Sequence, residues 1–222
     1  MVSLLTSIEE FAADLEAIGS APPPAPRWNQ DWFPRLDAAA AYAMVRSLRP
    51  RRIVEVGSGH STRFLARAVA DGALDTQITA IDPQPRATIE KLPVNWLRMP
   101  VQQVVAFPPL GAGDILFIDS SHQVKPGSDV EFLLKAVLPL LPAGVHVHFH
   151  DIFLPDDYPP QWEWRRYNEQ AAVAALIESN AFSVEFASHA LVSRSPEKIC
   201  GVLSRLPLLP GAIESSLWLT RN

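Results

Sequence analysis

The chain has 222 residues, 48% of them hydrophobic, and a formal net charge of −5. This length and apolar content suit one α/β domain with a substantial core. The acidic balance, with no basic run that would neutralise phosphates, excludes nucleic acid as the principal partner, so we expect a small-molecule ligand. No apolar run approaches the ~20 residues that span a bilayer, and no membrane partner is expected. The sequence contains one cysteine, Cys200, so an internal disulfide is excluded, as expected for a protein of the reducing cytoplasm. We expect Cys200 to pack within a helix.

The N-terminal segment is predicted to contain a helix and an arm. Apolar residues recur at helical spacing from residue 5 to residue 18, and Thr6 and Glu9 have the spacing of a capping box. The proline-rich stretch 21–26 is expected to be an extended linker, after which a helix capped by Asp37 ends before Pro50. We therefore divide the chain into an N-terminal helix and arm, 1–36, and a main domain, 37–222. The aromatic residues between linker and helix either anchor the arm on the core or wall a ligand site or dimer interface; they are Trp28, Trp32 and Phe33.

From residue 52 onward, short strand-like runs alternate with helix-like runs. The predicted strands are 53–56, 78–81, 96–99, 115–118, 145–149, 183–186 and 217–220. The predicted helices between them are 61–70, 129–141, 171–179 and 197–206. This βαβα order predicts a Rossmann-like, doubly wound, mostly parallel seven-stranded sheet with helices on both faces.

Polar residues follow four of these predicted strands. Ligands of such sheets bind beyond the carboxyl ends of the strands, so the clusters are expected to meet on one edge. A single polar residue at a strand end is common, but the joint placement of four clusters indicates a ligand site. The clusters are Gly57-Ser58-Gly59-His60-Ser61-Thr62, then Asp82, then Asp119-Ser120-Ser121-His122, and finally His150-Asp151.

The glycine turn after the first strand is typical of a cofactor site. Glycines let backbone N–H groups approach a ligand closely, and the start of the following helix favours an accepting group. Asp82 suits a carboxylate that binds ribose hydroxyls, although it could also cap the turn before Pro83. Thr62 stands where the dinucleotide fingerprint has Gly or Ala, which disfavours a dehydrogenase.

These motifs together resemble the class I S-adenosylmethionine-dependent methyltransferases. The resemblance rests on the segments 54–62, 81–82, 117–122 and 148–153. Within the class, these segments most resemble the small-molecule branch, which includes macrocin and catechol O-methyltransferases and methyltransferase domain family 24. The resemblance covers roughly residues 28–221 and implies an antiparallel last strand. It implies S-adenosylmethionine as cofactor, with the methionine part held by the glycine turn, the ribose by Asp82 and the adenine flanked near Gln102. The implied cofactor-binding residues are Glu55, Gly57, Ser58, Gly59, His60, Ser61, Thr62, Asp82, Pro83, Gln102 and Asp119.

The acceptor side of the implied site contains acids and histidines. Asp119 and Asp151 end neighbouring strands, so their carboxylates can converge on Mg²⁺ or another divalent cation. His150 either supplies a third metal ligand, softer than a carboxylate, or indicates that the metal site has been lost. If a metal is bound, the candidate ligands are Asp119, His150 and Asp151. His122 stands where catechol-type relatives place the base, and His122 and Asp119 are the candidate catalytic residues; His122 could instead be a loop residue that caps the turn before Pro126.

Two further features bear on the acceptor site. His146, His148 and His150 alternate along one strand, and we expect the first two to be core residues and only His150 to reach the functional edge. The connection 153–167 is long and rich in aromatic and proline residues, which is typical of a lid, an acceptor wall or a subunit contact. A homodimer would form through this connection or through the N-terminal arm.

The sequence predicts a methyltransferase that transfers a methyl group from S-adenosylmethionine to an oxygen of a small molecule. Alignment of cofactor and acceptor would supply much of the rate. Two alternatives remain open at this point: a metal-dependent hydroxylase-like enzyme on the same fold, and a cofactor-binding protein without catalytic activity.

Overall fold

The computed structural model of the chain describes residues 2–19 and 21–222. Its centre is a seven-stranded sheet with the strand order β3-β2-β1-β4-β5-β7-β6. Neighbours among β1 to β5 are parallel, whereas β7 runs antiparallel to both β5 and β6. This arrangement confirms the predicted Rossmann-like sheet with its antiparallel last strand. The strands are β1 (Arg52–Val56), β2 (Gln77–Ile81), β3 (Asn95–Leu97), β4 (Ile115–Ile118), β5 (His146–Phe149), β6 (Phe182–Ala187) and β7 (Leu217–Arg221).

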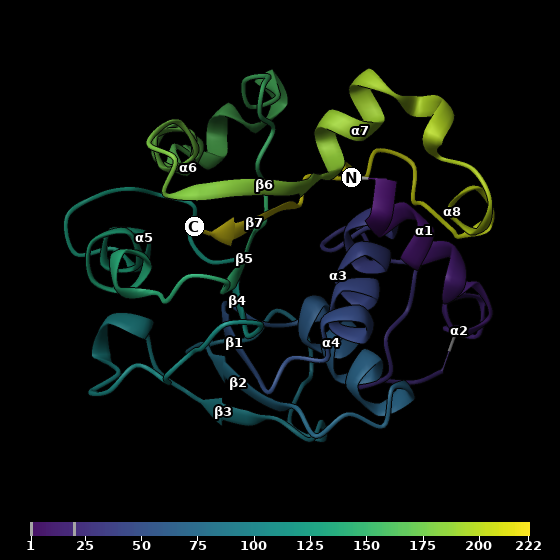
Figure 1. Ribbon diagram of the computed structural model, residues 1–222, viewed down its shortest axis with the longest axis horizontal. Coiled ribbons are helices and arrows are strands. Elements are labelled where there is room, and N and C mark those ends of the chain that lie inside the picture. The colour runs from purple at the N-terminus through teal and green to yellow at the C-terminus, as the bar shows by residue number, and fades with distance from the viewer. Residues whose placement is uncertain (1, 20) are drawn as a thin grey trace.

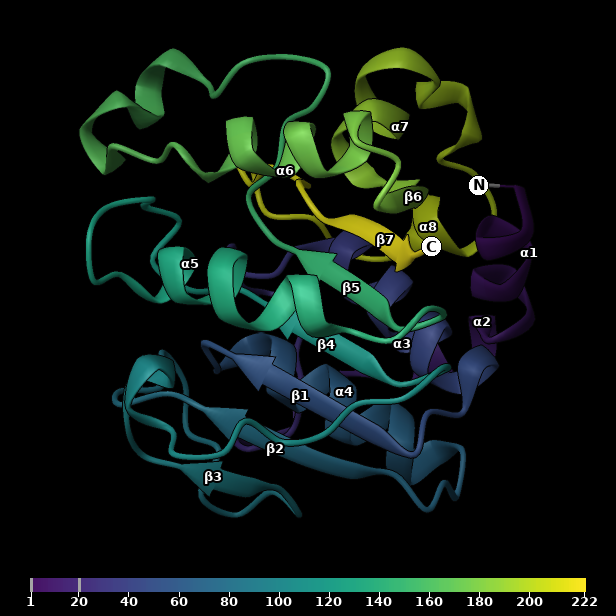
Figure 2. The same cartoon turned by 60° about the vertical axis from the view of Figure 1, so that its left-hand side comes forward.

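Helices cover both faces of the sheet (Figures 1 and 2). Each face has its own apolar core, because alternate residues of a strand point to opposite sides; Ile53 belongs to one core and Val54 to the other. The face with the smaller number of helices carries α5 (Asp129–Phe132) and α6 (Glu169–Glu178). The opposite face carries α1 (Val2–Glu10), α2 (Ala12–Glu16), α3 (Arg35–Leu48), α4 (His60–Asp71), α7 (Ser188–Arg194) and α8 (Val202–Arg205).

The N-terminal arm is anchored on the core through two of its three aromatic residues. Trp28 and Phe33 are buried, and both rings contact Phe64 of α4. Trp32 instead remains 45% exposed. Helix α1 begins at Val2, so Thr6 lies inside this helix and the predicted capping box does not mark its start.

Asp37 does not cap the helix that precedes the sheet, contrary to our prediction. Helix α3 begins at Arg35 after Pro34, and Asp37 lies in its first turn. The Asp37 carboxylate instead accepts the backbone N–H groups of Ser215 and Ser216. The proposed division between 1–36 and 37–222 stays a prediction, but it passes through this first helical turn.

Two of the predicted helices are interrupted. The run 129–141 forms α5, a π-helical turn over 133–137 and a 3-10 turn over 138–140, because Pro139 lacks the N–H that a continuous α-helix needs. The run 197–206 is divided by Gly201, which has a φ of 57° before α8. Cys200 lies just before this glycine and is exposed, so the prediction that it packs within a helix is wrong. Helix α7 was not predicted.

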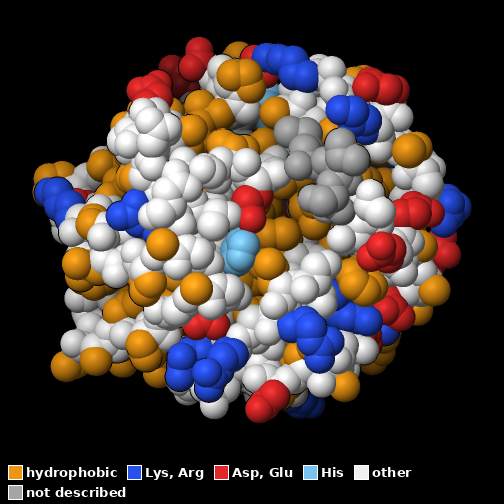
Figure 3. Space-filling view, in the orientation of Figure 1, with side chains coloured by type: hydrophobic (Ala, Val, Ile, Leu, Met, Phe, Trp, Pro, Cys, Tyr) orange, Lys and Arg blue, Asp and Glu red, His pale blue; other side chains and the backbone are white. Residues whose placement is uncertain are grey.

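The surface of the protein is mixed in charge. On the face drawn in Figure 3, acidic and basic side chains are scattered among hydrophobic ones, and the described residues there form no continuous basic patch. Within the described ranges, none of the helices combines the length and the apolarity needed to cross a bilayer.

Candidate active site

The turn after β1 fits closely against the end of β4. Gly57 has a φ of +80°, and a Cβ atom at this position would lie 1.8 Å from the backbone oxygen of Asp119. The backbone N–H of Gly57 donates to the carbonyl of Ile81, the last residue of β2. Only glycine satisfies both the dihedral angle and the close approach, and the ends of β1, β2 and β4 meet here as a result.

A buried carboxyl group stabilises the same turn from below. Glu55 Oε1 accepts the hydroxyl of Ser61 at 2.6 Å, and Oε2 accepts the hydroxyl of Thr62 at 2.6 Å. The Thr62 hydroxyl also accepts the backbone N–H of Gly59 at 2.9 Å. Burial raises the pKa of Glu55 to about 8, although both hydroxyl bonds act in the opposite direction. Glu55 and Thr62 are fully buried, so they stabilise the predicted cofactor turn through these hydrogen bonds.

A cavity of about 670 Å³ lies beyond the turn, across the carboxyl ends of β1, β2 and β4; we call it the larger pocket. Asp82 stands at its wall, where its carboxylate accepts the backbone N–H of Ser58 at 2.6 Å and that of Gln84 at 2.7 Å. Gln102, which lies within the 3-10 turn Val101–Gln103 after β3, also lines this pocket. The predicted cofactor residues that line this pocket are Gly57, Ser58, Asp82, Pro83, Gln102 and Asp119.

A second cavity of about 30 Å³, the smaller pocket, adjoins the first. Ser58, Arg86 and Asp119 line both pockets, so the two share a wall. His60 and Ser61 line the smaller pocket, although we had predicted them to bind cofactor. The remaining residues that line it are Trp32, Phe33, His122, His150, Asp151, Arg165 and Tyr167.

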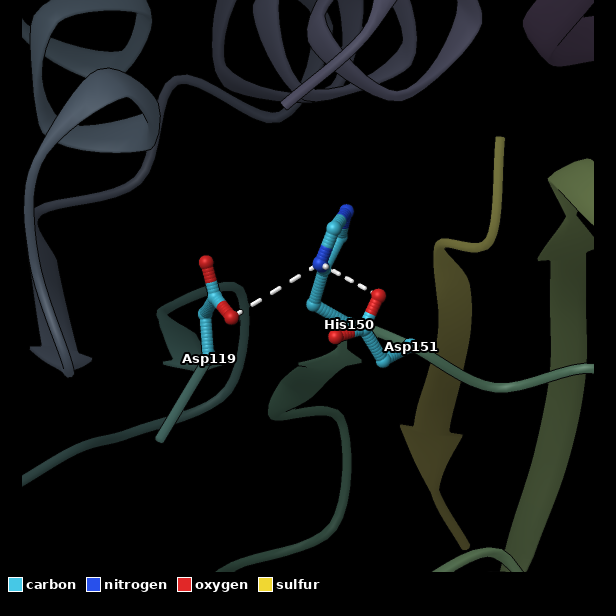
Figure 4. Close-up of side chains that lie close together, drawn as sticks. All are labelled: Asp119, His150 and Asp151. Atoms are coloured by element: carbon cyan, nitrogen blue, oxygen red, sulfur yellow. Dashed lines mark ion pairs between the residues drawn. The ribbon is translucent and has the colours of Figure 1, made fainter. Parts of the chain in front are cut away.

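Three potential metal ligands converge at the smaller pocket (Figure 4). Asp119 follows β4, and His150 and Asp151 follow β5. His150 Nδ1 lies 3.6 Å from Asp119 Oδ1 and 3.3 Å from Asp151 Oδ1. One donor atom from each residue lies within 4.8 Å of the others. The structure thus brings together all three residues that we predicted to bind a metal.

Asp37 holds the other side of the His150 ring. Asp37 Oδ2 lies 3.2 Å from His150 Nε2, and the carboxylate is fully buried. This bond favours a proton on Nε2 and turns Nδ1 toward Asp119 and Asp151. Burial lowers the pKa of His150, but Asp119, Asp151 and Asp37 outweigh that effect and raise it well above its ordinary value. Our sequence reasoning missed this role of Asp37, for which the only signal was an acid beside a run of four alanines.

His122 belongs to the same cluster, and its position excludes the alternative of a simple turn cap. The ring is buried, with Nδ1 3.0 Å from Glu169 Oε2 and Nε2 3.3 Å from Asp119 Oδ1. Its Nε2 also lies 3.6 Å from Asp151 Oδ2. Burial lowers the pKa of His122, but these three carboxylates outweigh it and raise the pKa well above the ordinary value. Glu169, in the first turn of α6, was also missed, because nothing in the sequence pairs it with a histidine 47 residues earlier.

Of the two histidines within β5, His148 lies in the core as predicted, whereas His146 is only half-buried. His148 is fully buried, stacks on Phe117 and bonds to the hydroxyl of Ser216 at 2.8 Å. His146 bonds to Glu185 of the edge strand β6 at 2.9 Å. Only His150 reaches the pockets at the carboxyl edge.

The fold and the site have the features of a Rossmann-like ligand-binding protein. A parallel sheet with an antiparallel last strand carries a glycine turn after β1, an acid after β2 and a pocket across the strand ends. Residues 54–152 match the family model of a methyltransferase domain, and they include β1, β2, β4, β5 and the cluster at their ends. The match covers 99 of the 222 residues, a little under half of the chain.

Solved structures share this fold at low sequence identity. The S-adenosylhomocysteine-bound methyltransferase PaMTH1 of Podospora anserina is 17% identical, with 99% of this chain and 88% of that chain covered and a TM-score of 0.54. A protein of Klebsiella pneumoniae assigned as an O-methyltransferase is 14% identical, with coverage of 99% and 90% and a TM-score of 0.50. The apo-structure of CmcI is 21% identical with a TM-score of 0.46, and the match covers 67% of this chain and 63% of CmcI, which is less than two thirds of its length. No curated protein sequence matches the chain.

Proposed function

We propose that the protein is an S-adenosylmethionine-dependent O-methyltransferase that acts on a small molecule with the help of a divalent cation. One observation carries this proposal: Asp119 lines both the larger pocket and the smaller pocket with its candidate metal ligands. A donor in the first pocket and an acceptor in the second would meet at this residue. The likeness to an S-adenosylhomocysteine-bound methyltransferase supports the choice of donor.

The larger pocket suits the donor in size and in chemistry. Its volume of about 670 Å³ lies within the usual range for small-molecule sites. The carboxylate of Asp82 would accept the ribose hydroxyls, and the turn at Gly57 and Ser58 would present backbone groups to the methionine part. The methyl group would then point toward the wall that the two pockets share.

The three candidate ligands fit a divalent cation. Two carboxylates and one imidazole provide hard and borderline donors, and Asp37 behind His150 is the carboxylate partner that metal-bound histidines usually have. An imidazole donor favours a transition ion such as Mn²⁺, Fe²⁺ or Zn²⁺ over Mg²⁺, which prefers oxygen ligands. Such an ion would lower the pKa of an acceptor hydroxyl bound beside it.

Methyl transfer at this site requires alignment and one proton acceptor. The acceptor oxygen would attack the methyl carbon in line with the carbon–sulfur bond, whose electron pair stays on sulfur as the bond breaks. The hydroxyl proton would go to His122 Nε2 once this ring is neutral. Glu169 orients the ring and would stabilise the resulting cation, as in other carboxylate–histidine pairs.

Calorimetry with S-adenosylhomocysteine tests the donor assignment. We expect micromolar binding by the intact protein and a loss of at least about tenfold in Asp82→Ala, since a good hydrogen-bonded carboxylate contributes this much. Asp75→Ala, which removes an exposed acid from the loop before β2, is the matched control and should bind normally. Absence of binding by the unaltered protein would refute the proposal.

Product analysis tests the reaction itself. Acceptor-dependent formation of S-adenosylhomocysteine from catechol and S-adenosylmethionine, abolished by EDTA, is the expected result. Oxygen uptake with a redox metal would instead indicate the hydroxylase-like alternative. Cofactor binding with neither activity would indicate a binding protein.

A further inference from the structure

The loop after β2 carries an arginine, Arg86, that lines both pockets. Ser58 and Asp119 are the other two residues common to the pockets, so the lining that they share contains one base, one hydroxyl group and one acid. The proposed donor and metal sites use Ser58 and Asp119 but not this arginine. A positive charge where two ligand cavities meet suits an anionic group of a bound ligand.

The backbone of Arg86 is fixed against the glycine turn. Its N–H donates to the carbonyl of Ser58 at 3.1 Å. Gly59 permits this close approach, because a Cβ atom at that position would lie only 3.3 Å from Arg86 Cβ. Pro83 and Pro85 precede Arg86 and restrict the backbone of the loop. The loop therefore holds Arg86 beside the turn that the proposed function assigns to the methionine part of the donor.

The side chain of Arg86 is exposed and keeps its hydrogen-bond donors free. Its guanidinium carbon lies over the ring of Trp32, 4.5 Å from the ring centre. Within residues 2–19 and 21–222, no carbonyl, hydroxyl or carboxylate group accepts a hydrogen bond from this guanidinium. Stacking uses the face of a guanidinium, whereas its N–H groups lie in its plane, so they remain available to a ligand.

The larger pocket is lined by one other base, Lys125, which lies in a different segment. Lys125 Nζ donates to the side-chain oxygen of Gln123 at 3.1 Å. The same segment contains Gly127, whose carbonyl accepts the side-chain amide of Gln102, and we expect Gln102 beside the adenine. Arg86 is thus the base that is attached to the glycine turn.

The acids of the larger pocket make such a base necessary for an anionic ligand group. Three carboxylates line this pocket, those of Asp82, Asp119 and Asp129. A further carboxylate, brought in by a ligand, would be repelled by these charges unless a cation lay beside it. S-adenosylmethionine carries a carboxylate on its methionine part, and the glycine turn is the place where we expect this part to bind.

We propose that Arg86 binds the carboxylate of the methionine part of S-adenosylmethionine, and that stacking on Trp32 orients its guanidinium. This inference rests on the proposed function, because it assigns a donor-binding residue of the same site. Arginine suits this task, since its planar fork can donate two parallel hydrogen bonds to a carboxylate. The N-terminal arm, which carries Trp32, then takes part in donor binding although it lies outside the matched residues 54–152.

The test compares two ligands that differ by the carboxylate alone: S-adenosylhomocysteine and its decarboxylated analogue, in which a hydrogen atom replaces this group. Calorimetry with the full chain gives the ratio of their dissociation constants. We expect S-adenosylhomocysteine to bind at least about tenfold more tightly, as a charge-assisted pair contributes. Arg86→Gln should lower this ratio to about threefold or less, while affinity for the analogue changes by no more than about twofold. Arg86→Lys keeps the charge without the fork and should give an intermediate ratio.

The part assigned to the arm has its own variant. Trp32→Leu removes the ring beneath the guanidinium and should lower the ratio by about twofold to threefold, the contribution of an exposed cation–π contact. An unchanged ratio in this variant refutes the part assigned to Trp32.

Matched variants separate the role of Arg86 from general effects of charge. Lys125→Gln removes the other base of the larger pocket. Arg98→Gln removes an exposed arginine that lies over the ring of Trp96, 5.1 Å from its centre. Both controls should keep the full ratio of the unaltered protein. Circular dichroism of each variant confirms that the fold is intact.

The remaining outcomes overturn the proposal in distinguishable ways. Equal affinity of the unaltered protein for both ligands, or a ratio that Arg86→Gln leaves unchanged, refutes the role of Arg86 and leaves the proposed function standing. An equal loss of affinity for both ligands in Arg86→Gln also refutes it, because the residue would then support the turn and not the carboxylate. Failure of the unaltered protein to bind S-adenosylhomocysteine at all refutes both proposals.

Discussion

The two pockets differ in how they are built. The larger pocket is formed by the turns that directly follow β1, β2 and β4, and its closest fit is between backbone atoms at Gly57 and Asp119. The smaller pocket is closed by ionisable and aromatic side chains from the N-terminal arm, three strand ends and the connection 153–167. The larger pocket has a volume of about 670 Å³, whereas the smaller pocket has only about 30 Å³. In the function that we propose, the donor binds where backbone geometry is fixed, and the acceptor binds where side chains determine specificity.

The largest expected effect comes from altering the backbone fit itself. Gly57→Ala should abolish S-adenosylhomocysteine binding and destabilise the protein by more than about 3 kcal/mol, because the new methyl group would overlap the Asp119 carbonyl. Calorimetry and thermal unfolding measure both effects. Gly113→Ala is the matched control: its φ is +84° but its added methyl group meets no atom within 4 Å, so only the backbone strain of about 1 kcal/mol is expected. Normal binding by Gly57→Ala would show that this contact does not shape the pocket.

Asp119, one of the three residues that line both pockets, should affect chemistry more than cofactor binding. Asp119→Asn is expected to reduce methyl transfer by at least about 100-fold, since it removes a charge beside the reacting oxygen, while S-adenosylhomocysteine affinity changes only a few-fold. Single-turnover rates and calorimetry report the two quantities separately. Asp129→Asn alters an acid that lines only the larger pocket and should leave Mn²⁺ affinity unchanged. Full turnover by Asp119→Asn would remove the central argument for the proposed function.

A smaller effect is expected at Asp37, which lies behind the candidate metal ligands. Asp37→Asn should weaken Mn²⁺ binding by about 10–100-fold without changing S-adenosylhomocysteine affinity, because the His150 ring loses the acceptor that orients it. Electron paramagnetic resonance of free Mn²⁺ measures the affinity. Asp114→Asn is the matched control, since this buried acid also accepts two backbone N–H groups, from Arg52 and Gly111. If both variants weaken the metal equally, the role of Asp37 is structural alone.

Taken per pH unit, the smallest effect concerns stability at the glycine turn after β1. The pKa of Glu55 is raised to about 8 in the folded state, so the folded chain holds a proton that the unfolded chain releases above its ordinary pKa of about 4.3. The free energy of unfolding should therefore fall as the pH rises between these two values. The Glu55→Gln variant has no titrating group at this position. The free energy of unfolding of the unaltered protein minus that of the variant should therefore decline by about 1 kcal/mol for each pH unit.

Urea unfolding at pH 5, 6, 7 and 8 measures this difference. Glu10→Gln, which replaces an exposed acid of α1, should leave the pH dependence as it is. Parallel curves for Glu55→Gln and the unaltered protein would show that Glu55 is ionised in the folded state, and the turn at Ser61 and Thr62 would then be held by a charged carboxylate.

The sequence predicted the site best where strand order alone determines position. Asp82, Asp119, His150 and Asp151 each follow a parallel strand, and the carboxyl ends of such strands meet on one edge whatever the side chains are. The sequence-based prediction of helices was wrong where a proline or a glycine interrupts a run of periodic apolar residues, as at Pro139 and Gly201. The spacing of apolar residues carries no information on the N–H that proline lacks or on the positive φ that glycine adopts.

The amino-acid sequence by itself determined the sheet, the glycine turn and the acids at the strand ends, because these depend on short-range periodicity and on the rule that parallel strands share one edge. Only the tertiary structure decided that Asp37 bonds to His150, that Glu169 bonds to His122, and that Arg165 and Arg86 both line the smaller pocket. Those partners lie on elements distant in the chain, and packing of whole helices and loops brings them together. No local pattern encodes such a pairing, so the side-chain contacts of the smaller pocket could be identified only in the folded protein.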